Sequence, residues 1–174
     1  KIICCILETE VKMEEFLSEI SYVQVPAYRF AKKSKISQNP EDEVIAEMMD
    51  WMKQNNLAPE NSRGIGYDIP VSKEYQEKGC RGYAFCQSIP EDFDIQDDVE
   101  VIQFQGGHYA KLRIDNPMED PFKKIPAGWN HLMETLKERN LLDHNWGEGT
   151  CFEECLMTDK GQIMDIYIRV KEAF

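Results

Sequence analysis

The sequence predicts an α+β fold in which two pseudo-symmetric strand–helix–strand–strand units form a mostly antiparallel sheet. Three observations lead to this prediction: one helical pattern occurs twice, a strand-like run precedes each copy, and two strand-like runs follow each copy. The helical segments EMMDWMKQNNL (47–57) and HLMETLKERNL (131–141) align without gaps, and both are amphipathic at helical spacing. Self-similarity at a fixed offset indicates a duplicated unit.

The segments around these helices match as well. VPAYRFAKKSKI (25–36) resembles FQGGHYAKLRI (104–114), and the two share an aromatic-Ala-Lys core. The four strand-like runs that follow the helices are 64–71 and 82–89 in the first half, and 151–157 and 163–170 in the second. The last run alternates apolar and polar residues, as a strand with two different faces does. The acidic segment 90–98 joins the halves.

One such unit does not complete a domain, because its helix covers only one face of a short sheet. Two units side by side give a longer sheet with two helices on one face and a cleft on the other, at the seam. We therefore expect a single domain over residues 21–171, with repeat one at 21–89 and repeat two at 99–171. Residues 1–20 lie outside the repeat and form either a short strand and helix that cover an edge or the tail of a linker.

The composition restricts the partners of the chain. The formal net charge is −12, which disfavours direct contact with nucleic acid because phosphate binding needs a basic surface. An acidic field keeps a protein soluble and favours cationic partners. If the chain regulates transcription, its DNA-binding domain lies on a missing segment or on another chain.

Metal, cofactor and membrane sites are not indicated. The six cysteines form no CxxC pair, the three histidines are scattered, and the glycines lack nucleotide-binding spacing. We expect no metal and no cofactor, with reduced, buried cysteines in a cytoplasmic protein. The longest apolar run, residues 2–7, is too short to cross a bilayer.

Strand alternation predicts which side chains share a face. In the last strand the even-numbered residues from 164 to 170 are apolar and should face the helices, so Tyr167 points the opposite way. In residues 151–157 the apolar pair Phe152 and Leu156 is expected to face the helices too. This arrangement places Glu153 on the cleft side, next to Tyr167.

Two further residue patterns bear on the cleft. Glu154 does not fit this arrangement, so it lies near the strand edge or a β-bulge shifts the register. In residues 82–89, Tyr83 and Phe85 alternate with small residues. We expect the large side chains to face the helices and the small ones to face the cleft, which leaves room for a ligand.

A carboxylate bounded by aromatic rings is a good receptor for a cationic aromatic molecule, because it combines charge pairing with cation–π and stacking contacts. Partial burial would raise the pKa of Glu153 and leave it unpaired until a cation arrives. An exposed strand glutamate is the alternative. Tyr67, Tyr109 and Tyr167 are candidate ring contacts, with core-edge packing as their alternative, and Trp129 is expected to open the second helix.

The two-unit plan resembles the GyrI-like small-molecule-binding domains, which include effector-binding domains of AraC-type and multidrug-responsive MerR-type bacterial regulators. The resemblance covers about residues 21–171 and rests on an ordered set of segments: VPAYRFA, DWMKQNNL, IGYDIP, FQGGHYAKLRID, WNHLMETLKERNL, CFEECLMTD and MDIYIRV.

The resemblance implies a glutamate in the cleft that meets cationic, lipophilic ligands. That glutamate follows an aromatic residue, which matches Glu153 after Phe152. Glu154 and Cys155 stand where the family has an apolar residue and a tyrosine, and the added charge suits a more strongly cationic ligand. Tyr167, Tyr67 and Trp129 also match positions of the family pattern.

These observations lead to three functional hypotheses. The first is binding of amphipathic, aromatic, cationic small molecules, as an effector-sensing domain of a transcriptional regulator or as a stand-alone drug-binding protein. The second is a hydrolase of reactive electrophilic small molecules, with Glu153 as general base and Tyr167 as acid or donor. The third is an inhibitor of a DNA-binding enzyme, which the acidic surface would suit. The sequence has no catalytic triad pattern, and we assign no catalytic residue from it.

Overall fold

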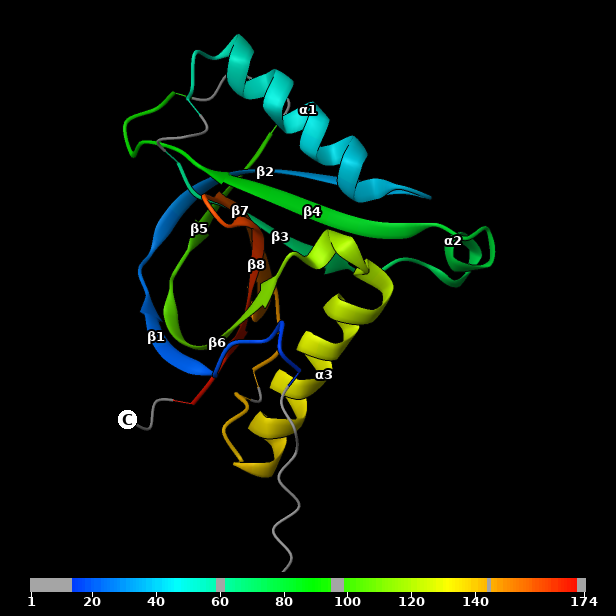
Figure 1. The fold of residues 1–174 in the computed structure, drawn as a ribbon. Coiled ribbons are helices and arrows are strands. Elements are labelled where there is room, and N and C mark those ends of the chain that lie inside the picture. Colours follow the sequence, from blue (N-terminus) through cyan, green and yellow to red (C-terminus); the bar gives the residue numbers. More distant parts are fainter. Residues whose placement is uncertain (1–13, 59–61, 95–98, 144, 172–174) are drawn as a thin grey trace, which may run out of the picture.

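The computed structural model describes residues 14–58, 62–94, 99–143 and 145–171. Its strands form one curled sheet, and the two long helices lie on one side of it (Figure 1). The elements in chain order are β1 (Ser21–Val25), β2 (Tyr28–Ser37), α1 (Pro40–Gln54), β3 (Gly64–Ile69), α2 (Lys73–Glu77), β4 (Arg81–Ser88), β5 (Glu100–Phe104), β6 (Gly107–Asp115), the 3-10 helix η2 (Pro117–Glu119), α3 (Pro121–Glu138), β7 (Cys151–Thr158) and β8 (Gly161–Arg169).

The sheet has eight strands in the order β1-β6-β8-β7-β3-β4-β2-β5, and all neighbours pair antiparallel. The first unit is β2-α1-β3-β4 and the second is β6-α3-β7-β8. The units meet where β3 pairs with β7, and Gly66 lies opposite Glu153 there. Because β1 pairs with β6 and β5 pairs with β2, each unit receives its edge strand from the other half of the chain.

Each long helix packs on its own unit. Helix α1 begins at Pro40, a favourable first position, and its acidic first turn suits the positive end of the helix dipole. It packs on β2 and β4, whereas α3 packs on β6 and β8. Neither helix packs extensively on β3 or β7 within the described residues. The helix-side cores are Ala31, Met48, Trp51, Met52 and Ile89 under α1, and Leu17, Ala110, Leu112, Ile114, Leu132, Leu136, Met164, Ile166, Ile168 and Val170 under α3.

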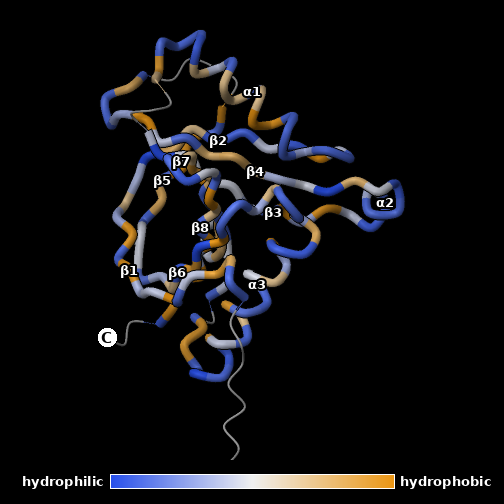
Figure 2. Tube along the Cα trace, in the orientation of Figure 1, coloured by the Kyte–Doolittle hydropathy of each residue, from blue (hydrophilic) through white to orange (hydrophobic). Residues whose placement is uncertain are grey.

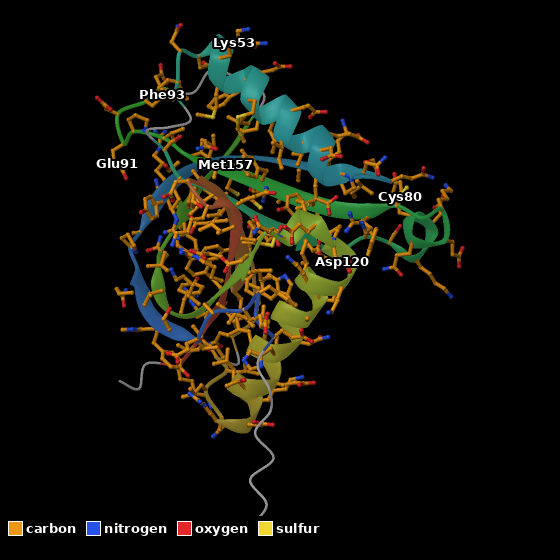
Figure 3. All side chains as sticks on the ribbon, in the orientation of Figure 1. Lys53, Cys80, Glu91, Phe93, Asp120 and Met157 are labelled. Carbon is orange, nitrogen blue, oxygen red and sulfur yellow. The ribbon has the colours of Figure 1, made fainter. Side chains whose placement is uncertain are left out.

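The inside of the curl holds a separate, largely aromatic core. Side chains fill this side of the sheet in Figure 3. The members are Val25, Phe30, Ile65, Tyr67, Ala84, Cys86, Phe104, Tyr109, Phe152 and Tyr167. A cavity of about 150 Å³ remains there, and Tyr67, Phe104 and Arg169 are among its lining residues. By contrast, the short α2 buries no residue and is hydrophilic throughout (Figure 2).

The predicted duplicated α+β fold is confirmed, since both units have the expected strand–helix–strand–strand order. The facing of β4 is also confirmed. Phe85 packs with the α1 core, and Ala84 and Cys86 lie in the aromatic core. The prediction that Trp129 opens the second helix is wrong, because α3 begins at Pro121 and includes Pro126. An interior proline loses a backbone hydrogen bond and usually marks a helix boundary, but packing of α3 on β6 and β8 overrides that preference.

The sequence did not predict the edge strands β1 and β5. Of residues 1–20, positions 1–13 lie outside the described residues. Leu17 forms an isolated antiparallel bridge with Ile114, and its side chain is buried in the core under α3. Residues 14–20 therefore lie along β6, which favours the edge-covering alternative for this part of the segment.

Candidate ligand-binding site

Strand β7 presents a different carboxylate to each face of the sheet. Phe152 lies opposite Tyr167, and their rings stack with centroids 4.5 Å apart. Glu153 lies opposite Ile166 and therefore faces the helices, whereas Glu154 points with Phe152 into the curl. The prediction that Glu153 shares a face with Tyr167 is wrong.

The error has a physical cause. We expected apolar residues of this strand to point to the helices because we expected the other face to be open. The sheet instead curls around the aromatic core, so the beginning of β7 has apolar neighbours on both faces: Cys151 packs against the core under α3, and Phe152 lies in the aromatic core. When both faces of a strand are buried, alternation no longer tells which side is which.

Tyr83 and Gly66 define the surroundings of Glu153. The Tyr83 hydroxyl donates a hydrogen bond to Oε1 of Glu153 at 2.7 Å. To do so, the Tyr83 side chain crosses β3 at Gly66, where an added Cβ would lie 1.8 Å from the phenol oxygen. Glycine is thus needed at this position for steric reasons. Among the described residues Glu153 accepts this bond and forms no ion pair.

Burial dominates the electrostatics of Glu153 and raises its pKa to about 7. The Tyr83 hydrogen bond opposes this shift, because it stabilises the carboxylate. The charges of Asp68 and Glu41 raise the pKa further, and that of Arg81 lowers it. The outcome is a half-buried carboxylate whose pKa is raised toward neutral pH and which pairs with no lysine or arginine of the described residues.

Glu154, the next residue, is fully paired. Arg63 donates from Nε and Nη2 to its two carboxylate oxygens at 2.6 and 2.7 Å. The guanidinium carbon also lies 5.3 to 5.6 Å from the ring centroids of Tyr28, Phe152 and Tyr167. A carboxylate and three rings therefore surround a cation that belongs to the chain itself.

A second set of polar contacts lies at the cavity inside the curl. Glu148 pairs with Lys32 and accepts a hydrogen bond of 2.7 Å from the Tyr67 hydroxyl. The two partners hold the pKa of Glu148 below its usual range. The Tyr109 hydroxyl donates to the carbonyl oxygen of Gly149 at 2.7 Å. These contacts hold the segment that precedes β7 against β2, β3 and β6 of the curled sheet.

The structure thus divides the candidate residues between two places. Tyr67, Tyr109 and Tyr167 gather in the aromatic core inside the curl. Glu153 and Trp129 lie on the helix side, where Trp129 is half-buried against the core under α3. A contact between the three tyrosines and a ligand stays a prediction, and of the three only Tyr67 lines the cavity.

Sequence reasoning did not assign Tyr83, Gly66, Asp68 or Arg63 to the surroundings of these carboxylates. One usable signal was present. The glycines of GIGYDI in β3 indicate a strand that another side chain or backbone approaches closely. Nothing in the local sequence indicates that Arg63 reaches β7, because that contact depends on the pairing of the two units.

Metal binding, membrane insertion and thiol chemistry are not favoured by the part of the chain that the structure describes. No three His, Cys, Asp or Glu side chains are grouped so that they could hold a metal ion. None of the helices there is both long and apolar enough to span a bilayer. Cys86 is buried, and burial raises the pKa of its thiol to about 12.

The fold itself identifies the class of the protein: a duplicated α+β domain whose two units share one curled antiparallel sheet. Comparison with protein families makes this assignment specific. The chain belongs to the GyrI-like family, described as the GyrI-like small molecule binding domain, whose model matches residues 18–171. None of the curated proteins matches the chain.

Several solved structures resemble this one. EcmrR in its DNA complex superposes with a TM-score of 0.66 at 12% identity, over 91% of this chain and 59% of the EcmrR chain. The chain thus spans little more than half of the length of EcmrR. A hydrolase from Listeria innocua superposes with a TM-score of 0.55 at 7% identity, over 88% of this chain and 92% of the hydrolase chain. SAV2435 bound to tetraphenylphosphonium superposes with a TM-score of 0.51 at 14% identity, over 89% of this chain and 95% of the SAV2435 chain. At these identities the likeness shows the fold.

Proposed function

We propose that the chain binds lipophilic aromatic cations at the junction of its two units, with Glu153 as the counter-charge. One observation carries the proposal: Glu153 is a half-buried carboxylate that one tyrosine holds in place and that forms no ion pair in the part of the chain that the structure describes. Its neighbour Glu154 has such a cation in Arg63. A charge that is buried without a partner lowers the stability of the folded protein, so we attribute its presence to ligand binding rather than to folding.

A bound cation would offset the unfavourable burial of the Glu153 carboxylate. Transfer of Glu153 from water to a partly apolar site has already raised its pKa, which measures the free energy that a cation can recover. A large aromatic cation loses little hydration on binding and contributes apolar contact as well. The site therefore favours cations over neutral molecules of the same shape.

The position of Glu153 suits access by a ligand. It lies on β7, one of the two central strands that neither long helix covers extensively. Opposite it stands Gly66, over which the Tyr83 phenol passes, so the ring of Tyr83 forms one wall beside the carboxylate. Glu153 is half-buried rather than fully buried, and we propose that a ligand approaches its carboxylate from the helix side.

The comparisons support the same function. The family is described as a small-molecule-binding one, and SAV2435 carries a lipophilic aromatic cation. EcmrR is a larger chain that binds DNA. We propose that this chain acts as the effector-sensing domain of a regulator or as a stand-alone drug-binding protein, with direct DNA contact left to another segment or chain.

Titration of the intrinsic tryptophan fluorescence with tetraphenylphosphonium tests the proposal, with triphenylphosphine oxide as the neutral analogue. At pH 8 the wild type should bind the cation saturably and discriminate against the oxide. Glu153→Gln should weaken cation binding about tenfold or more, the loss of one partly desolvated charge pair. Glu138→Gln, at an exposed position of α3, is the matched control. Equal affinity of wild type and Glu153→Gln would overturn the proposal.

Hydrolysis is a second candidate that one observation favours. A carboxylate whose pKa is about 7 is suited to act as a general base at neutral pH, and the Tyr83 hydroxyl is close enough to orient it. A panel of activated esters and epoxides, followed by mass spectrometry, tests this role. Turnover that disappears in Glu153→Gln would support it, and unchanged electrophiles after long incubation would rule it out for those classes.

A further inference from the structure

The surroundings of Glu153 contain a second acidic group on the same face. Gly66 lies opposite Glu153, and Asp68 follows two residues later on β3, so Asp68 and Glu153 are diagonal neighbours on the helix side. Such neighbours are about 7–8 Å apart. Asp68 is exposed, and within the described residues it forms no ion pair.

The charges around Glu153 leave a local excess of two negative charges. The charged side chains that act on it are Asp68, Glu41 and Arg81. Arg81 is already bound by Glu41, with Nη2 2.5 and 2.6 Å from the two carboxylate oxygens. Once this pair is set aside, Glu153 and Asp68 remain as two carboxylates that form no ion pair with any residue that the structure describes. The negative charge of Asp68 adds to the effect of burial and raises the pKa of Glu153 further, as its place on the same face of the neighbouring strand leads us to expect.

We propose that the site prefers dications over monocations, with Glu153 and Asp68 each taking one positive charge. This inference rests on the proposed function, because it names the class of ligand for the same site. The suitable ligand carries two cationic groups on a lipophilic spacer, separated by roughly the 7–8 Å between the diagonal neighbours.

Glu153 and Asp68 contribute differently to binding of the dication. Glu153 is half-buried and fixed by Tyr83, so it provides the stronger, less hydrated contact. Asp68 is exposed and binds through a more screened interaction, so it contributes selectivity rather than most of the affinity. Glu154 does not provide the second charge, since Arg63 neutralises it inside the curl. The extra acidity expected from the sequence thus comes from a different residue.

A matched pair of ligands tests the proposal by isothermal titration calorimetry at pH 8. Hexamethonium carries two trimethylammonium groups on a hexamethylene chain, and hexyltrimethylammonium carries one group on the same chain. The wild type should bind hexamethonium about tenfold more tightly. Asp68→Asn should remove most of this preference and change binding of the monocation by no more than about twofold.

Asp50→Asn, an exposed substitution on α1, is the control for loss of one acidic charge. Equal affinity of the wild type for both ligands, or equal weakening of both by Asp68→Asn, would overturn the dication preference. A tetraphenylphosphonium titration separates the two proposals. If that cation binds and depends on Glu153 while the dication shows no preference, only this inference fails. If none of the cations binds, both fail.

Discussion

Glu153 and Glu154 are adjacent in the sequence and opposite in their physical situation. Glu154 points into the curl, where two hydrogen bonds from Arg63 and three aromatic rings complete a closed, neutral arrangement. Glu153 points to the helix side, where a tyrosine hydroxyl is its hydrogen-bond donor and burial raises its pKa to about 7. The first carboxylate is bound by the fold, and the second remains available to a ligand.

The comparison shows how a chain can place a structural charge and a binding charge side by side. Alternation along β7 sends neighbouring side chains to faces that have separate surroundings. The inside of the curl holds Arg63 as an internal cation for one carboxylate. On the helix side, at the junction of the two units, the other carboxylate forms no ion pair with the residues that the structure describes.

The largest effect is expected from breaking the paired carboxylate. Glu154→Ala leaves the Arg63 guanidinium largely buried without its counter-charge, and it should lower the free energy of unfolding by about 3 kcal/mol. Urea denaturation measures this loss. The double substitution Arg63→Met with Glu154→Leu should recover much of it, because it removes both charges and fills the space. A stable Glu154→Ala variant that no longer binds tetraphenylphosphonium would reverse the roles given to the two glutamates.

Removal of the charge of Glu153 should change the stability in the opposite direction and raise the free energy of unfolding. The pKa of Glu153 is about 7 in the folded protein and about 4.3 in an unfolded chain, so the folded state binds more protons between these values. Stability from this group is therefore greatest at low pH and falls as the pH rises toward 7. Glu153→Gln should stabilise the protein by about 1–3 kcal/mol at pH 8, and the gain should shrink as the pH approaches 5.

Thermal unfolding of the two proteins at both pH values checks this prediction, with Glu138→Gln as the control. A Glu153→Gln variant that is less stable than the wild type at pH 8 would mean that the carboxylate has a cationic partner in the folded chain.

A smaller effect is expected at the glycine that lets Tyr83 reach Glu153. Gly66→Ala puts a methyl group where the Tyr83 phenol lies, so the ring must move and its hydrogen bond must lengthen or break. We expect a loss of about 1–2 kcal/mol in stability and a higher pKa for Glu153. Gly147→Ala, where an added Cβ meets nothing within 4 Å, should be close to neutral. Equal effects of the two substitutions would show that Tyr83 does not depend on Gly66.

The parts of the fold that the sequence predicted are those that depend on local pattern. The two helices and the six strands of the repeated units have clear periodicity, and the large and small residues of β4 gave its facing. The edge strands β1 and β5 are short and pair with the opposite unit, so their partners are far away in the sequence. Local alternation contains no information about such exchanges.

The candidate site was predicted only in part for a related reason. The sequence singles out Glu153, but the prediction of the face it occupies depends on one side of the sheet being open. The curl that buries Phe152 and Tyr167 on that side is a property of the whole sheet. Tyr83 and Asp68 reach the surroundings of Glu153 only after β3 and β7 have joined the two units.

The most direct measurement is an NMR pH titration of the side-chain carboxyl carbon of Glu153, assigned by comparison with Glu153→Gln. The account predicts a midpoint near 7 in the free protein and a clear decrease when tetraphenylphosphonium is bound, because the cation favours the ionised carboxylate. A midpoint in the ordinary range of about 4.3 that the ligand does not move would contradict the claim that Glu153 is an unpaired binding charge.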